Sequence, residues 1–189
     1  MKKEDARVKK TKEKLFEAFR NLLADKTYED ITVNEICTVA GIRRATFYKH
    51  FTDKHDFMSS MAMSLIQRFD SRMSRTKLKS YPVEYHVEYV RRLVRFLVEN
   101  GELVNSIFKS KMLASLVGMI VQENYKILCV RLAHSVENGE KLVASIDTTA
   151  TLLAGGIGSI IVKWFEAEMP TSQEELTTQI ESIVKAMFI

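Results

Sequence analysis

Residues 31–57, ITVNEICTVAGIRRATFYKHFTDKHDF, contain the start signals of three closely spaced helices. Thr32 and Glu35 have the spacing of a capping box, in which the hydroxyl accepts from the Glu35 amide and the carboxylate accepts from the Thr32 amide. Ile31 and Ile36 flank this box at the positions of a hydrophobic staple. The pattern predicts a short helix that begins after Thr32 and ends near position 40.

A glycine turn and a second helix follow directly. Gly41 stands where a left-handed backbone is needed, and glycine adopts a positive φ without steric cost. Ile42 and Phe47 have the spacing of a second staple, which predicts a helix over residues 44–50. A helix, a tight turn and another helix with short arms form the helix-turn-helix arrangement.

The second of these helices has the composition of a helix that reads DNA. Arginine, lysine, hydroxyl groups and helix N-termini meet phosphates, and side chains that project into the major groove meet base edges. Phe47 and Phe51, four residues apart, can anchor the opposite side of the helix. The basic and polar residues at its start and on its exposed side are Arg43, Arg44, Thr46, Tyr48, Lys49 and His50.

The stretch TVNEICTVAGIRRATFYKHFTDKHDF closely resembles the DNA-binding signature of TetR-type (TetR/AcrR) transcriptional regulators, and its core GIRRATFYKHF resembles the form found in members from Firmicutes. Many members carry a serine at the position of Arg43, where it caps the recognition helix. An arginine side chain cannot accept a hydrogen bond from an amide, so that cap must come from elsewhere. The resemblance implies phosphate contacts by Thr32, Tyr48, His50 and Lys54, and it leaves Arg43, Arg44, Thr46 and Lys49 as candidates for base edges.

Composition and charge agree with a DNA-binding end attached to a helical body. The chain has 189 residues, 46% hydrophobic and 28% charged, which is ordinary for a soluble globular protein. Two prolines and seven glycines leave few helix breakers, and few stretches alternate as strands do, so the sequence predicts an all-α protein. Residues 1–80 carry 18 Lys and Arg against 11 Asp and Glu, a net charge of +7, whereas residues 81–189 carry 10 against 13, a net charge of −3. Solvated surface charge alone would also produce such an asymmetry.

The apolar spacing along the chain predicts about nine helices. A charged arm over residues 1–7 precedes a first helix over 8–24, which completes a three-helix unit. Asp53 and Asp56 suit the N-cap and first turn of a long helix over 54–78, which joins this unit to a C-terminal helical bundle. The predicted domains are a helix-turn-helix DNA-binding domain over 1–52 and an effector-binding and dimerisation domain over 53–189. The predicted helices of the bundle cover about 82–100, 102–109, 111–138, 146–167 and the residues after Ser172.

Methionines and aromatic residues in the middle helices have two interpretations. They can form an ordinary core, or they can line an effector pocket, since flexible methionines tolerate varied ligands. The resemblance implies a pocket for an unknown small molecule among these helices. The candidate lining residues are Met61, Phe69, Phe96, Phe108, Met112 and Met119.

The last two helices resemble the dimerisation pair of the family. The glycine-rich segment AGGIGS at 154–159 has no preceding strand and no lysine after the glycines, so small residues that let helices approach explain it better than a phosphate-binding loop. Met169 lies near a position where many family members carry glycine. The candidate dimer residues are Leu152, Gly156, Ser159, Ile160, Trp164, Leu176, Ile180, Ile183 and Met187.

Other chemistry finds little support in the sequence. His86 and His134 have no histidine, cysteine or carboxylate four residues later, so we expect no metal site, and nothing indicates a cofactor. Cys37 and Cys129 lack metal-site spacing, and no arrangement of catalytic residues points to an enzyme. The charged N-terminus is not a signal peptide, and no apolar run reaches the ~18 residues of a membrane span, so we expect a cytoplasmic protein without membrane contact.

Together these features predict a homodimeric regulator, expected to act as a repressor, that binds a palindromic operator in double-stranded DNA and responds to a small molecule. Two alternatives stay open at this point. One is a regulator or activator whose C-terminal domain answers a partner protein. The other is a helical enzyme that merely carries a basic end, and it predicts turnover without salt-sensitive DNA binding.

Overall fold

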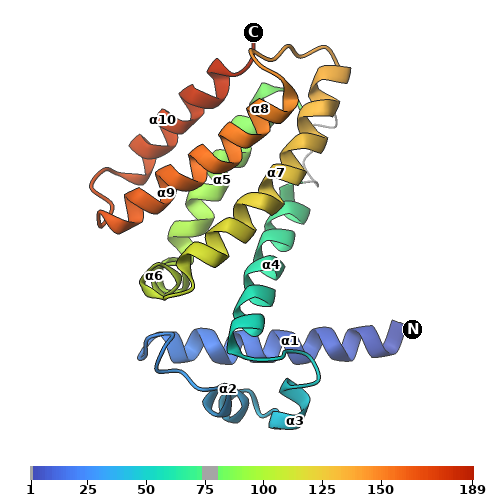
Figure 1. The fold of residues 1–189 in the computed structure, drawn as a ribbon, viewed down its shortest axis with the longest axis vertical. Helices are drawn as coiled ribbons and strands as arrows, with labels where there is room; N and C mark the ends of the chain where they lie inside the picture. Colours follow the sequence, from blue (N-terminus) through green and yellow to red (C-terminus); the bar gives the residue numbers. More distant parts are fainter. Residues whose placement is uncertain (1, 74–80) are drawn as a thin grey trace. The chain divides into compact units, whose positions relative to one another are not determined.

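The computed structural model describes residues 2–73 and 81–189 of the chain (Figure 1). Every regular element in these residues is a helix, which confirms the predicted all-α fold. The segments α8, η1 and α9 follow one another without a gap, so the described residues contain nine continuous helices. The bounds are α1 Lys2–Leu23, α2 Val33–Ala40, α3 Arg44–Phe47, α4 Lys54–Met73, α5 Val83–Glu99, α6 Gly101–Lys109, α7 Leu113–Glu137, α8 Ile146–Thr151, η1 Leu152–Gly156, α9 Ile157–Glu166 and α10 Gln173–Ala186.

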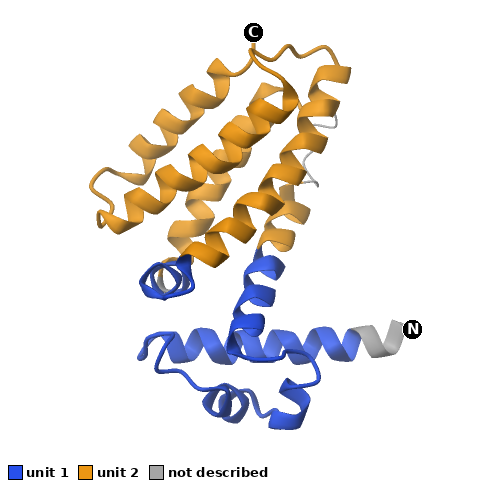
Figure 2. Cartoon of the chain, in the orientation of Figure 1, with its two compact units in different colours: residues 1–65, 102–113 blue, residues 66–101, 114–189 orange. Residues whose placement is uncertain are grey.

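The chain divides into two compact units (Figure 2). The N-terminal unit contains residues 1–65 and 102–113, and the C-terminal unit contains residues 66–101 and 114–189. Helix α4 contributes its first part to one unit and its last part to the other. This division differs from the predicted boundary after position 52, and that domain assignment stays a prediction.

Aromatic side chains form the core of the N-terminal unit. Phe57 of α4 lies 5.5 Å from Phe19 of α1, 5.5 Å from Phe47 of α3 and 5.1 Å from Phe51, measured between ring centroids. All four rings are buried. Burying one such ring contributes roughly 1.5–3 kcal/mol, so this cluster fixes α3 against α1 and α4.

In the C-terminal unit, α10 packs along α5 and buries Leu176, Ile180 and Val184. Ser172 caps α10, because its hydroxyl accepts from the Glu175 amide at 3.1 Å. Trp164 of α9 is buried, and its indole nitrogen donates to the carbonyl of Thr171 at 3.0 Å.

The glycine-rich segment combines a π-helical stretch with a close helix approach. Five residues, LLAGG, widen the helix into η1 between α8 and α9. One turn later, a Cβ built on Gly158 would lie 3.3 Å from the Cγ2 atom of Val121 in α7. The small residue therefore lets α9 approach α7 within one subunit. Met169 adopts a left-handed φ of 56°, a conformation that favours glycine.

Two helix boundaries differ from those predicted from the sequence. Helix α1 begins at Lys2, whereas the sequence predicted a charged arm over residues 1–7 and a helix that starts only at position 8; residues 2–7 contain no glycine or proline to stop a helix. Helix α3 ends at Phe47, and residues 48–50 form a turn. The predicted end of the helix that starts at Lys54 falls on residues 74–78, outside the described residues.

Two apolar helical stretches are long enough to cross a membrane by length and composition, which corrects the expectation that none exists. They are residues 113–137 and 146–166. The core helices of soluble helical bundles pass the same test, so this finding is weak evidence for a span. In the apolar window of α7, 6% of the residues are buried, so other described residues cover this helix only partly.

Candidate nucleic-acid interface

The capping box predicted at the start of α2 is present. The Thr32 hydroxyl accepts from the Glu35 amide at 3.2 Å, and the Glu35 carboxylate accepts from the Thr32 amide at 2.8 Å. Lys26 forms an ion pair with the same carboxylate. The hydrogen bond from Lys26 and those from Thr32 lower the pKa of Glu35 to about 2, so the carboxylate stays charged. These contacts fix the start of α2.

Gly41 makes the turn between α2 and α3. Its φ is 64°, and its amide donates to the Thr38 carbonyl at 3.2 Å while the next amide, of Ile42, donates to the Cys37 carbonyl at 2.9 Å. This is the glycine-terminated helix end that the sequence predicted. The turn brings Arg43 into an extended conformation just before α3.

Helix α3 is short and buries one side. Phe47 is fully buried, and the side chain of Arg43, the N-cap residue, makes no capping hydrogen bond, as expected for arginine. After Phe47 the chain forms a turn, in which the amide of His50 donates to the Phe47 carbonyl at 2.9 Å. The predicted seven-residue helix is therefore one helical turn followed by a hydrogen-bonded turn.

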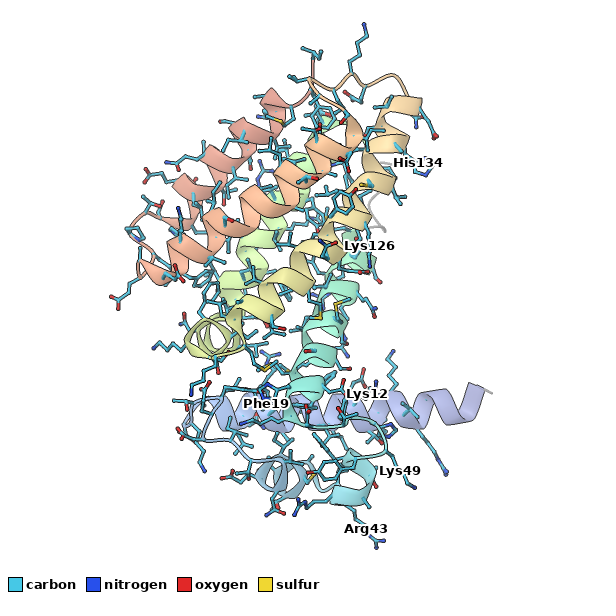
Figure 3. All side chains as sticks on the ribbon, viewed as in Figure 1. Lys12, Phe19, Arg43, Lys49, Lys126 and His134 are labelled. Atoms are coloured by element: carbon cyan, nitrogen blue, oxygen red, sulfur yellow. The ribbon has the colours of Figure 1, made fainter. Side chains whose placement is uncertain are left out.

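The residues predicted to contact DNA are gathered on the solvent side of this segment. Arg43, Arg44, Tyr48 and Lys49 are exposed, and Thr46 and His50 are half-buried. The guanidinium carbon of Arg44 lies 5.9 Å from the centre of the Tyr48 ring. Figure 3 shows Arg43 pointing away from the other helices of this unit, with Lys49 on the same segment. Three exposed cations, in α3 and in the residues on either side of it, suit the phosphate and base contacts of a DNA-binding helix.

The comparisons with known proteins agree with this geometry. Residues 15–61 match the family described as bacterial regulatory proteins, tetR family. Two Bacillus subtilis proteins named as HTH-type transcriptional regulators are similar: YxbF is 43% identical over 58 residues, and YwcC is 29% identical over 102 residues. Residues 15–61 therefore form a domain of the tetR-family type. The match covers 30% of the chain and 15% of YxbF, and 50% of the chain and 46% of YwcC, so it spans less than half of either relative.

Solved structures share the fold of more than nine tenths of the chain. A TetR-family regulator from Syntrophomonas wolfei has a TM-score of 0.76 at 17% identity and covers 94% of both chains. FadR from Bacillus subtilis, in complex with stearoyl-CoA, has a TM-score of 0.67 at 16% identity over 92% of this chain and 97% of FadR. The dihydroxyacetone kinase operon activator DhaS has a TM-score of 0.69 at 21% identity over 93% and 94%. These neighbours are all under 25% identical to the chain, so they show that it shares their fold.

Lys54 of the TetR-family domain has a role that the sequence did not predict. Its ammonium group donates to the carbonyls of Tyr28, Glu29 and Ile31 at 2.7, 3.2 and 2.8 Å. It also lies 4.3 Å from the centre of the Tyr28 ring. Partial burial lowers the pKa of Lys54. Lys54 therefore closes the loop before α2, and a contact with phosphate would have to share this ammonium group.

Tyr28 and His55 form a second unpredicted contact. The Tyr28 hydroxyl lies 3.2 Å from the Nδ1 atom of His55, and burial raises the pKa of Tyr28 to about 12. The two residues are 27 positions apart, so helical periodicity contains no signal for this pairing. The contact adds a further link between the start of α4 and the loop before α2.

The predicted pocket residues are distributed over both units. Phe69 and Phe96 lie together in the C-terminal unit, with ring centroids 5.5 Å apart. Met61, Phe108 and Met112 belong to the N-terminal unit, and Met119 belongs to the C-terminal unit. Met61 and Met112 are buried, whereas Phe108 and Met119 are half-buried. The lining of a pocket by these six residues stays a prediction.

The predicted dimer residues fall into two groups by exposure. Trp164, Leu176 and Ile180 are buried within the subunit, so their surfaces are already covered. Leu152 and Ile183 are exposed over 51% and 40% of their surfaces. Ser159 is also exposed, and Gly156, Ile160 and Met187 are half-buried. The exposed apolar residues are the ones that a second subunit would cover.

Proposed function

We propose that the chain is a homodimeric repressor in which each subunit places α3 in the major groove of a palindromic operator, and that a small molecule bound in the C-terminal unit controls this binding. The observation that carries the proposal is the set of exposed basic residues in α3 and directly beside it, Arg43, Arg44 and Lys49, held in place by the caps of α2 and the buried Phe47. This regulator would act in the cytoplasm.

The contact roles follow from exposure and chemistry. We assign base edges to Arg43, Arg44 and Lys49, because all three are exposed: Arg43 is the N-cap of α3, Arg44 lies in α3, and Lys49 lies in the turn that follows. Half-buried Thr46 is a fourth candidate of shorter reach. We assign phosphates to the hydroxyl and imidazole groups of Thr32, Tyr48 and His50, with Lys54 contributing only what its three carbonyl partners leave available.

The dimer supplies the symmetry of the operator. A two-fold axis implies two half-sites about one helical turn, roughly 34–36 Å, apart or more. Exposed apolar residues on η1 and α10, Leu152 and Ile183, are the expected contact surface. Sedimentation velocity would test it with Leu152→Glu against the matched control Val39→Glu, since both residues are 51% exposed. Dissociation by the first substitution alone supports this dimer, and a monomeric wild-type protein refutes it.

Three observations support control by a small molecule. The fold is that of FadR, which was crystallised with stearoyl-CoA. Helix α7 is apolar but only partly covered, and Phe69 and Phe96 lie together among aromatic neighbours. Helix α4 carries Lys54 in one unit and Phe69 in the other, so it can transmit a change between them. A ligand shifts this equilibrium only as far as it binds one arrangement better.

The experiment titrates labelled DNA from upstream of the protein's own gene with the protein. Fluorescence anisotropy measures the binding at several salt concentrations. We expect a preferred site and a slope of log affinity against log salt of about −0.9 per phosphate contact. A reporter assay then shows whether the protein represses or activates transcription. This is worth measuring because one protein with the same fold, DhaS, is named as an activator. Failure to bind any DNA at low salt would refute the proposal.

A further inference from the structure

A buried charged group lies among tyrosine rings in the C-terminal unit. The guanidinium carbon of Arg131 in α7 is 5.9, 5.2 and 5.0 Å from the ring centres of Tyr81, Tyr85 and Tyr89. Arg131 is 4% exposed, and its Nη2 atom pairs with the carboxylate of Asp70 in α4. We call these five residues the Arg131 cluster.

Two hydrogen-bond donors of the Arg131 cluster have no partner among the described residues. They are the Nη1 atom of Arg131 and the hydroxyl of Tyr85, and both are buried. The neighbouring polar groups are satisfied: the Tyr89 hydroxyl donates to Asn124 at 3.1 Å, and Nε2 of His86 lies 3.1 Å from the Ser135 hydroxyl. Buried donors are rarely left unpaired, because water is lost without a replacement. Two such donors on one cluster point to an acceptor supplied from outside the chain.

The charge of the cluster restricts that acceptor. Arg131 is balanced by Asp70, burial raises the pKa of Tyr85 and of Tyr89, and burial and the charge of Arg131 lower the pKa of His86 to about 4. A carboxylate brought here would leave a buried net negative charge, which is costly unless a further cation pairs with it. A neutral oxygen, such as a carbonyl, accepts from both donors without that cost.

The walls of the cluster restrict the rest of the molecule. Phe69, Met73, Tyr85 and Tyr89 form one buried apolar core, and half-buried Tyr81, Leu93 and Phe96 pack against it. Phe69 lies edge-on to Tyr89, with 5.1 Å between ring centroids. Tyr81, Leu93 and Phe96 are each partly exposed to solvent. A flat aromatic body fits such walls through edge-to-face contacts.

We propose that the Arg131 cluster binds a neutral aromatic small molecule whose carbonyl oxygen accepts hydrogen bonds from Arg131 Nη1 and the Tyr85 hydroxyl. The role of this cluster as an effector site rests on the proposed control of DNA binding by a small molecule. The binding of the molecule to the cluster does not depend on that control, so ligand binding and its effect on DNA affinity are measured separately.

The first test uses the ligand-free protein. Tyr85→Phe removes a hydroxyl without a partner, whereas the matched substitution Tyr89→Phe removes one that is bonded to Asn124. We expect the melting temperature of Tyr85→Phe to equal or exceed that of the wild type, and that of Tyr89→Phe to fall. An equal fall in both would show that the Tyr85 hydroxyl is already satisfied, and it would overturn the proposal.

The second test compares three probes by the shift in melting temperature: acetophenone, ethylbenzene of similar shape without an acceptor, and anionic benzoate. We expect acetophenone to stabilise the wild type more than the other two. Tyr85→Phe should weaken acetophenone binding roughly three- to tenfold, the range of one neutral hydrogen bond, and leave ethylbenzene unchanged. Arg131→Lys, which keeps the charge opposite Asp70, should also remove the preference for acetophenone.

Two results overturn this site: acetophenone stabilises no more than ethylbenzene, or benzoate stabilises most. Repeating the acetophenone titration with operator DNA separates the two proposals. Binding of acetophenone without a change in DNA affinity would keep the site and reject it as an effector site. Both proposals would be supported if acetophenone releases the wild-type protein from DNA, and Tyr85→Phe weakens both the binding of acetophenone and this release.

Discussion

Replacing Lys54 with methionine tests whether this residue holds the helix-turn-helix together or contacts DNA. The ammonium group donates to three carbonyls at 2.7–3.2 Å and lies over the Tyr28 ring. A hydrogen bond to a charged group contributes roughly 1.5–3 kcal/mol, and a cation–π contact roughly 0.5–2 kcal/mol. Two effects offset part of this sum. Burial of the ammonium group costs desolvation energy, which also lowers the pKa of Lys54. In the variant, water can bond to the loop carbonyls in place of the ammonium group. We expect a net loss of about 2–3 kcal/mol in the free energy of unfolding.

The matched control is Lys49→Met, which removes an exposed ammonium group from the turn that follows α3. Urea unfolding followed by circular dichroism gives the free energy of unfolding, and amide hydrogen exchange of residues 26–32 localises the effect. We expect Lys54→Met to lose stability and protection of this loop, and Lys49→Met to change stability by less than about 0.5 kcal/mol while weakening DNA binding. If Lys54→Met keeps its stability and weakens DNA binding as Lys49→Met does, then Lys54 contacts DNA and does not hold the loop before α2.

Two other substitutions test local contacts. Thr32→Ala should cost about 1 kcal/mol in urea unfolding, because the Glu35 amide loses its acceptor; an unchanged midpoint would show that water replaces the cap. His86 is neutral in the folded state, since burial lowers its pKa from 6.5 to about 4, so the unfolded chain takes up a proton first on acidification. The free energy of unfolding should therefore be unaffected by this group above about pH 6.5. Between pH 6.5 and 4 it should fall by about 3 kcal/mol. In His86→Gln this fall should be smaller. An equally steep fall in the variant would assign the titration to another group.

Local sequence signals predicted the features that depend on neighbouring residues. Thr32 and Glu35 lie within one turn of each other, and Gly41 meets a local need for left-handed backbone, so spacing and residue type were sufficient. The buried anchor Phe47 followed from its position in the staple. The exposed basic residues of α3 could be listed for the same reason, since the other side of a short helix is the one that packs.

Contacts between distant residues could not be predicted in this way. Lys54 meets carbonyls 23 to 26 positions earlier, and Arg131 pairs with Asp70 across 61 positions. Nothing in helical periodicity relates such pairs, so Lys54 was assigned to phosphate by resemblance alone. Leu176 and Ile180 show a related limit: their apolar stripe indicated a buried face, but the pattern cannot tell the subunit's own α5 from a second subunit.

The central claim is that the exposed face of α3 reads the operator. The most direct measurement is the affinity of Arg44→Ala for the operator and for operators changed at single base pairs. Arg95→Ala is the control, because Arg95 is also exposed but lies on α5. We expect Arg44→Ala to lose about 1–3 kcal/mol, roughly five- to 150-fold in affinity, and to relax the preference at one base position, while Arg95→Ala binds as the wild type does. Unchanged affinity and unchanged base preference in Arg44→Ala would contradict the assignment of α3 as the reading helix.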